Sequence, residues 1–87
     1  MIIKMLKSER DYLLENVLVN NVTLTEIIKK AHFANGKFEI EIEIELADEI
    51  RDLCSERLQI EGFDKDYELT EDGKVLEMLI DTFYNGT

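Results

Sequence analysis

Four glutamates alternate with aliphatic residues between Phe38 and Leu46, and they are the residues of this chain best suited to bind a partner. A period of two is typical of a β-strand with one buried and one wet face, so all four carboxylates would lie on one side. Same-face neighbours in a strand lie about 7 Å apart, so such a row repels itself unless a basic group lies against it. We therefore expect a basic protein partner here. The predicted site residues are Glu39, Glu41, Glu43 and Glu45, with Asp48 and Asp52.

Catalytic residue types are scarce. His32 and Cys54 are the only histidine and cysteine, and a nucleophile and base could in principle be built from them. However, Cys54 falls on an apolar helical stripe, where cysteine behaves as a small hydrophobe, and His32 has a structural role opposite Glu39. The chain contains no Gly-rich phosphate loop, Walker-type lysine or serine nucleophile elbow. We predict that the protein is not an enzyme and needs no cofactor.

The run Asp64-x-Asp66-x-Glu68 is similar to the start of a calcium loop. An EF-hand loop needs glycine at its sixth position and glutamate at its twelfth, and these positions hold Leu69 and Val75. We therefore interpret the run as a polar loop between helices and expect no metal site.

The acidic charge is concentrated in the second part of the chain. The net charge is −10; residues 1–37 hold six basic and four acidic residues, whereas residues 38–87 hold four basic and sixteen acidic ones. This distribution opposes binding to nucleic acid or anionic membranes and favours encounter with a basic protein, although it would also serve solubility alone. With no apolar run near the roughly 20 residues that span a bilayer, no secretory signal and a single cysteine, we expect a cytoplasmic protein of a bacterium or mobile element.

The chain is short enough for one domain, residues 1–87. Ser8 and the acids that follow it predict a helix over residues 9–19. The alternating run predicts a strand over residues 38–46, with Ile40, Ile42, Ile44 and Leu46 facing the core.

Residues 24–34 allow two interpretations. Thr23-Leu24-Thr25-Glu26 fits the capping box of a helix. Asn35-Gly36 between two apolar runs instead indicates a β-hairpin, which would place Phe33 opposite Phe38 and His32 opposite Glu39. We favour the hairpin, with strands at about 22–34 and 37–46, because it supplies hydrogen-bond partners for the second strand.

Two helices follow, at about 47–60 and 70–84, each with an apolar stripe at helical spacing. Gly62 ends the first and Thr70 begins the second. The predicted fold is therefore α+β: an N-terminal helix, an antiparallel hairpin, and two C-terminal helices packed on one face.

Four segments of the second half carry a family resemblance: Ala47–Leu53, Gly62–Asp64, Tyr67–Thr70 and Leu76–Phe83. Their pattern resembles small acidic bacterial proteins, among them the immunity proteins of contact-dependent and other polymorphic toxin systems. The resemblance implies an immunity or inhibitor protein that binds a basic toxin or nuclease and occludes its site. Two alternatives stay open: a DNA-mimic inhibitor from a phage or mobile element, and a small structural or regulatory subunit that self-associates, as a homodimer, through a strand edge.

Overall fold

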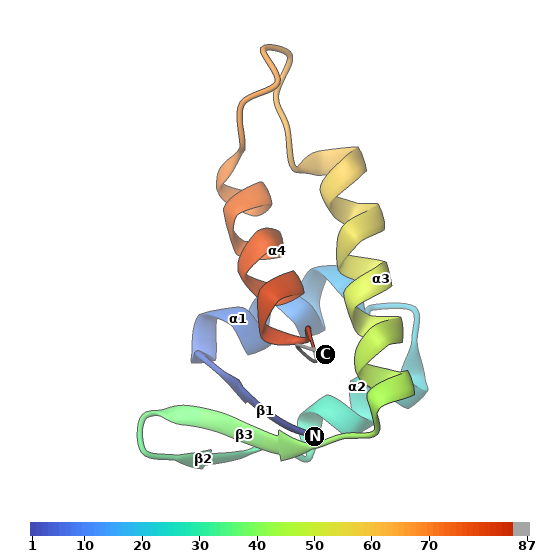
Figure 1. The fold of residues 1–87 in the computed structure, drawn as a ribbon, viewed down its shortest axis with the longest axis vertical. Helices are drawn as coiled ribbons and strands as arrows, with labels where there is room; N and C mark the ends of the chain where they lie inside the picture. Colours follow the sequence, from blue (N-terminus) through green and yellow to red (C-terminus); the bar gives the residue numbers. More distant parts are fainter. Residues whose placement is uncertain (85–87) are drawn as a thin grey trace.

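A computed structural model describes residues 1–84 and has the expected α+β class (Figure 1). A three-stranded antiparallel sheet lies at one end of the molecule, and the helices extend from one side of it. In chain order the elements are β1 (Ile2–Met5), α1 (Lys7–Tyr12), the π-helical segment η1 (Leu13–Val17), α2 (Val22–Lys29), β2 (His32–Ala34), β3 (Lys37–Glu41), α3 (Ile44–Glu61) and α4 (Glu71–Thr82).

The predicted hairpin turn is confirmed. Asn35 and Gly36 both have positive φ, 54° and 82°, as the tight turn between β2 and β3 requires. The register pairs Phe33 with Phe38 and His32 with Glu39, as expected from their chemistry.

Strand β1 was not predicted, and it changes the sheet. It pairs antiparallel with the other edge of β3, so the strand order is β1-β3-β2 and β3 is the central strand. Ile3 lies opposite Ile40 on the buried face, and Lys4 lies opposite Glu39 on the wet face. Two strands, rather than one, therefore supply hydrogen-bond partners for the backbone N–H and C=O groups of β3.

The predicted strand over residues 38–46 is wrong in its second half. Strand β3 ends at Glu41, Ile42 is buried as predicted, and α3 begins at Ile44. Ile44 is 50% exposed instead of facing the core, and Leu46 is half-buried. The ladder between β1 and β3 ends at the pair Ile2 and Glu41, and the backbone N–H of Ile42 donates to the carbonyl of Met1, the residue before β1, at 2.9 Å.

Residues 22–34 contain both of the structures that the sequence allowed, so the long first hairpin strand is wrong. Helix α2 occupies most of the segment, and only its last three residues form β2. The N-cap is Asn21, two residues before the expected cap Thr23, and its side chain accepts the Leu24 N–H at 3.0 Å.

The N-terminal helix begins earlier than predicted, and Ser8 is not its cap. Leu6 is the residue at the N-cap, where its N–H donates to the Glu9 carboxylate at 2.8 Å. The helix continues as η1 and ends at Val17 rather than Val19. The Glu9 side chain therefore does the capping that we expected of serine.

Helices α3 and α4 form an antiparallel pair joined by a projecting loop (Figure 1). Thr70 caps α4 as predicted, because its hydroxyl accepts the Gly73 N–H at 3.0 Å. Gly73 lies so close to Gly62 that a Cβ atom on it would fall 2.2 Å from the Gly62 carbonyl oxygen. The two glycines thus allow the start of α4 to pack against the end of α3.

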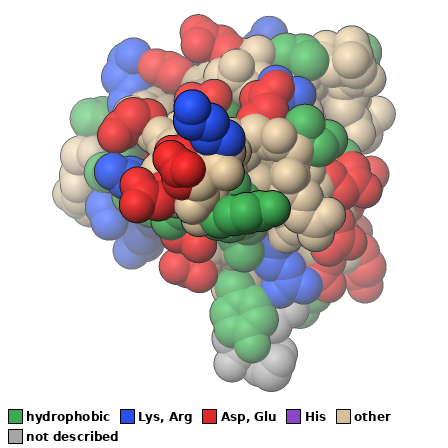
Figure 2. Space-filling view, turned by 90° about the horizontal axis from the view of Figure 1, so that it is seen from above, with side chains coloured by type: hydrophobic (Ala, Val, Ile, Leu, Met, Phe, Trp, Pro, Cys, Tyr) green, Lys and Arg blue, Asp and Glu red, His purple; other side chains and the backbone are tan. Residues whose placement is uncertain are grey.

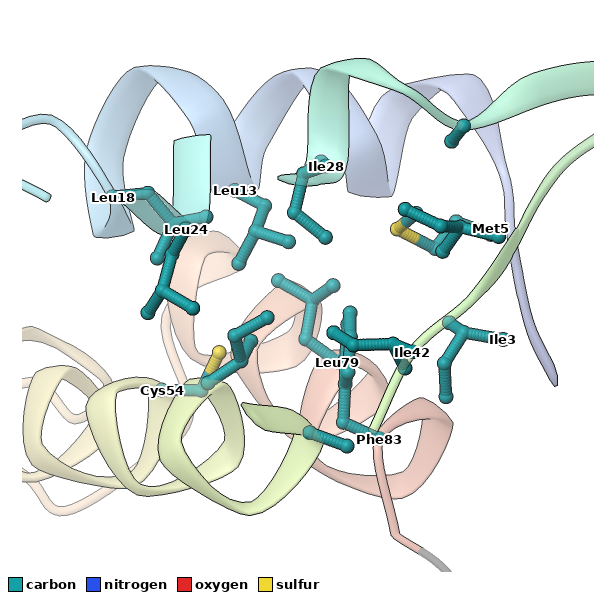
Figure 3. Packing of buried hydrophobic residues seen from close by; sticks show 14 of the residues in the cluster. Ile3, Met5, Leu13, Leu18, Leu24, Ile28, Ile42, Cys54, Leu79 and Phe83 are labelled. Carbon is teal, nitrogen blue, oxygen red and sulfur yellow. The ribbon is translucent and has the colours of Figure 1, made fainter. Parts of the chain in front are cut away.

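The core lies between the sheet and the helices (Figure 3). Ile3 and Met5 of β1 contribute from one side, and Leu79 and Phe83 from the last part of the chain. Cys54 faces this core and is fully buried, as its place on the apolar stripe predicted. Helix α3 makes its main contact with α4 rather than with the sheet.

Candidate partner-binding surface

The structure separates the six predicted site residues into two groups, with Glu43 between them. Glu39 and Glu41 lie on the outer face of the sheet, Glu43 sits at the junction, and the others lie on α3. The flat row of four carboxylates expected of a single strand is therefore broken after Glu41.

The Glu39 carboxylate already has basic neighbours within the fold. Its carboxylate lies 3.6 Å from the Lys4 ammonium and 4.0 Å from the His32 imidazole, and its side chain is only 23% exposed. Lys4 is therefore a basic group of the chain itself that lies against Glu39. The sequence interpretation missed it because Lys4 belongs to the unpredicted strand β1. A hollow of about 270 Å³ beside them is lined by Ile2, His32, Glu39, Ile40 and Glu41.

Asp48 is also paired. Its carboxylate lies 3.3 Å from the Arg51 guanidinium, one turn along the same helix. Glu41, Glu43, Glu45 and Asp52 are exposed, and the ion pairs found among residues 1–84 involve none of them. These four predicted residues thus keep their charge available to a partner.

Helix α3 adds two acids that the sequence interpretation did not select, Glu49 and Glu56. With Glu45 and Asp52 they stand at positions i, i+4, i+7 and i+11, which lie within about 40° of one line along a helix. All four are exposed, and we call them the acidic stripe. Helical spacing counted from Glu45 would have found the stripe, but the strand prediction for residues 38–46 concealed it.

The acidic stripe works against the stability of its own helix. Consecutive acids of the stripe are spaced i,i+3 or i,i+4, and each such pair of like charges lowers the stability of a helix by about 0.2–0.5 kcal/mol. Only Glu45 gains from its place in the first helical turn, where the helix dipole favours a negative charge. Figure 2, which looks onto the end of the molecule with the projecting loop, shows more acidic than basic side chains across that face too.

The structure does not assemble a nucleophile and base from His32 and Cys54. His32 is exposed on the outer face of the sheet, whereas Cys54 is buried in the core on the other side. Burial raises the pKa of the Cys54 thiol to about 12, so the reactive thiolate is suppressed at neutral pH.

The run that resembles a calcium loop satisfies its own backbone. One Asp64 oxygen accepts the N–H groups of Asp66 and Glu68, at 2.8 and 3.1 Å. Among residues 1–84, no three His, Cys, Asp or Glu side chains converge in a way that could hold a metal ion. In the same part of the chain, every helix is too short or too polar to cross a bilayer.

Comparisons with protein-family models, with curated proteins and with solved structures found no match to this chain.

Proposed function

We propose that this protein binds a basic protein through the acidic stripe together with Glu41 and Glu43. The observation that carries the proposal is the stripe itself: four exposed carboxylates along one side of α3, outside every ion pair found in residues 1–84. A surface with charge of one sign speeds encounter with a partner of opposite charge and disfavours partners of the same charge.

The cost of the stripe to the helix supports this proposal. Solubility requires net charge but does not require acids in a line, since scattered acids would repel one another less. Elsewhere on the same helix, Arg51 and Arg57 neutralise Asp48 and Glu61. The stripe lacks such neutralisation, so its advantage is expected to come from outside the fold.

The class of partner follows from the resemblance of the segments within 47–83 to immunity proteins. We propose an immunity or inhibitor protein that neutralises a basic toxin or nuclease by occluding its site, and that acts in the bacterial cytoplasm. Nuclease sites that bind phosphates are basic, and an acidic helix face complements them in charge.

The test compares the wild-type chain with Glu45→Gln/Glu49→Gln/Asp52→Asn/Glu56→Gln as bait in lysate of the source cells. We expect the wild-type bait to enrich a basic protein at low salt that the stripe variant does not. A second bait, Glu15→Gln/Glu26→Gln/Glu71→Gln/Asp72→Asn, removes the same charge from other exposed positions and should retain the partner.

A growth assay of cells that express the enriched protein then tests the immunity role. Expression of the enriched protein alone should stop growth, and co-expression with the wild-type chain should restore it while the stripe variant should not. Capture of a nucleic-acid enzyme without toxicity would favour the DNA-mimic alternative. Capture by both variants alike would contradict the stripe as the interface.

A further inference from the structure

A second feature of the surface, separate from the acidic stripe, has the chemistry of a side-chain receptor. A hollow of about 330 Å³ opens between α3 and α4, lined by Leu58, Glu77, Ile80 and Asp81. Leu58 and Ile80 are half-buried members of the core boundary, and the two acids are exposed. Leu58 lies two residues beyond Glu56, about 200° around the helix, so the hollow and the stripe face different directions.

The hollow combines an apolar floor with an acidic wall. Glu77 and Asp81 are one turn apart on α4, about 6 Å along the helix axis. Among residues 1–84 neither carboxylate lies within ion-pair distance of a lysine, arginine or histidine. Like charges at this spacing repel each other, so the pair would be stabilised by a cation placed between them.

We infer that this hollow receives an arginine side chain presented by the basic protein partner. The aliphatic stem of arginine can lie on Leu58 and Ile80 while its guanidinium reaches the two carboxylates. Arginine fits better than lysine, because its planar fork can donate to two carboxylates at once and is more weakly hydrated than an ammonium. With four lining residues, the hollow is too open to enclose a free small molecule.

The chain has an arginine of its own that reaches from α3 to the residues after α4. Arg51 lies seven residues before Leu58, on nearly the same side of α3, and Tyr84 lies three residues after Asp81. The Arg51 guanidinium sits 5.4 Å from the centre of the Tyr84 ring. An arginine of this chain thus lies against Tyr84, after the end of α4, and we assign the hollow itself to an arginine of the partner. This inference rests on the proposed function, because it assumes a basic protein partner, and that partner must reach around α3 from the acidic stripe to the hollow.

The experiment uses two blocked peptides as probes, acetyl-Leu-Arg-Leu-Arg-amide and its lysine counterpart, titrated into the ¹⁵N-labelled full chain. We expect the arginine peptide to bind more tightly and to shift the amide signals of Leu58, Glu77, Ile80 and Asp81. The variant Glu77→Gln/Asp81→Asn should bind the arginine peptide about fivefold or more weakly, the effect of losing two exposed ion pairs.

A matched control removes the same charge elsewhere. Glu15→Gln/Glu26→Gln changes two exposed acids on other elements and should alter the affinity less than twofold. Because all four acids are exposed, both variants should keep the folded spectrum, which the same experiment records. Equal weakening by both variants, equal binding of both peptides, or shifts confined to the acidic stripe would each overturn the inference.

The outcome is separable from that of the proposed function. Arginine binding in the hollow without capture of any basic protein would contradict the proposed function and keep the hollow as a guanidinium site. Capture through the acidic stripe without arginine binding would overturn only the inference about the hollow.

Discussion

Ile42 and Ile44 are two residues apart, and the structure gives them opposite environments. Ile42 is buried after the end of β3, whereas Ile44 is 50% exposed in the first turn of α3. Burying an aliphatic side chain contributes about 1.5–3 kcal/mol, and a buried unpaired charge costs more. We therefore expect Ile42→Glu to unfold the domain and Ile44→Glu to leave it folded, as measured by circular dichroism and urea unfolding. Unfolding by both substitutions would support a strand through residue 46 instead.

Cys54 provides a second test at the scale of one residue. Its pKa is raised to about 12 by burial, so folding favours the neutral thiol. This contribution to stability is full below the pKa of the unfolded thiol, about 8.5, and is lost as pH rises from there through about 12. We expect the native thiol to react with a disulfide reagent at pH 8 far more slowly than the urea-unfolded chain. Rapid reaction under native conditions would show that Cys54 is accessible.

Gly73 sets how closely α4 approaches the end of α3. In an exposed helix, changing glycine to alanine adds about 0.5–1 kcal/mol of stability. Here a methyl group would collide with the Gly62 carbonyl oxygen, and overpacking of this kind costs about 1–3 kcal/mol. We therefore expect Gly73→Ala to lower the free energy of unfolding, measured by urea titration. A stabilised variant would mean that the helices are further apart than described.

Asp48 and Asp52 differ in their surroundings on α3, although both belong to the predicted site. Asp52 lies between Glu49 and Glu56 of the acidic stripe, whereas Asp48 pairs with Arg51. We expect Asp52→Asn to stabilise the protein by about 0.4–1 kcal/mol, because its like-charge pairs with Glu49 and Glu56 are relieved, whereas Asp48, also one turn away, is already paired with Arg51. Asp48→Asn should give no such gain. Thermal unfolding at low and high salt measures both, and the gain should shrink as salt screens the repulsion.

At the scale of the whole molecule, Glu9 joins the two ends of the described chain. Its carboxylate is buried, accepts the Leu6 N–H at 2.8 Å and lies 3.2 Å from the Thr82 hydroxyl, which also donates to Met78. Hydrogen bonds to a charged group contribute about 1.5–3 kcal/mol, so Glu9→Ala should destabilise the fold by that order. Thr82→Val should destabilise the fold less, because the single hydroxyl proton of Thr82 is shared between Glu9 and the Met78 carbonyl. A double-mutant cycle from urea unfolding should show coupling between the two residues, and strict additivity would argue against the contact.

The sequence by itself determined the local structures whose signals are complete within a few residues. The Asn35-Gly36 turn, the Thr70 cap and the apolar stripes of the last two helices depend on neighbours along the chain. The same holds for the burial of Cys54. Each signal combines backbone preference with helical or turn spacing, so no distant partner is needed to predict it.

Only the tertiary structure decided where β3 ends and which acids remain unpaired. Strand β1 has four residues, too few for a clear period, yet it supplies both the second ladder of the sheet and the Lys4 partner of Glu39. An alternating run can continue as a strand only while another strand pairs with its backbone. The ladder between β1 and β3 ends at Glu41 and α3 begins at Ile44, so the predicted row of carboxylates is broken and only Glu45 of that row belongs to the acidic stripe.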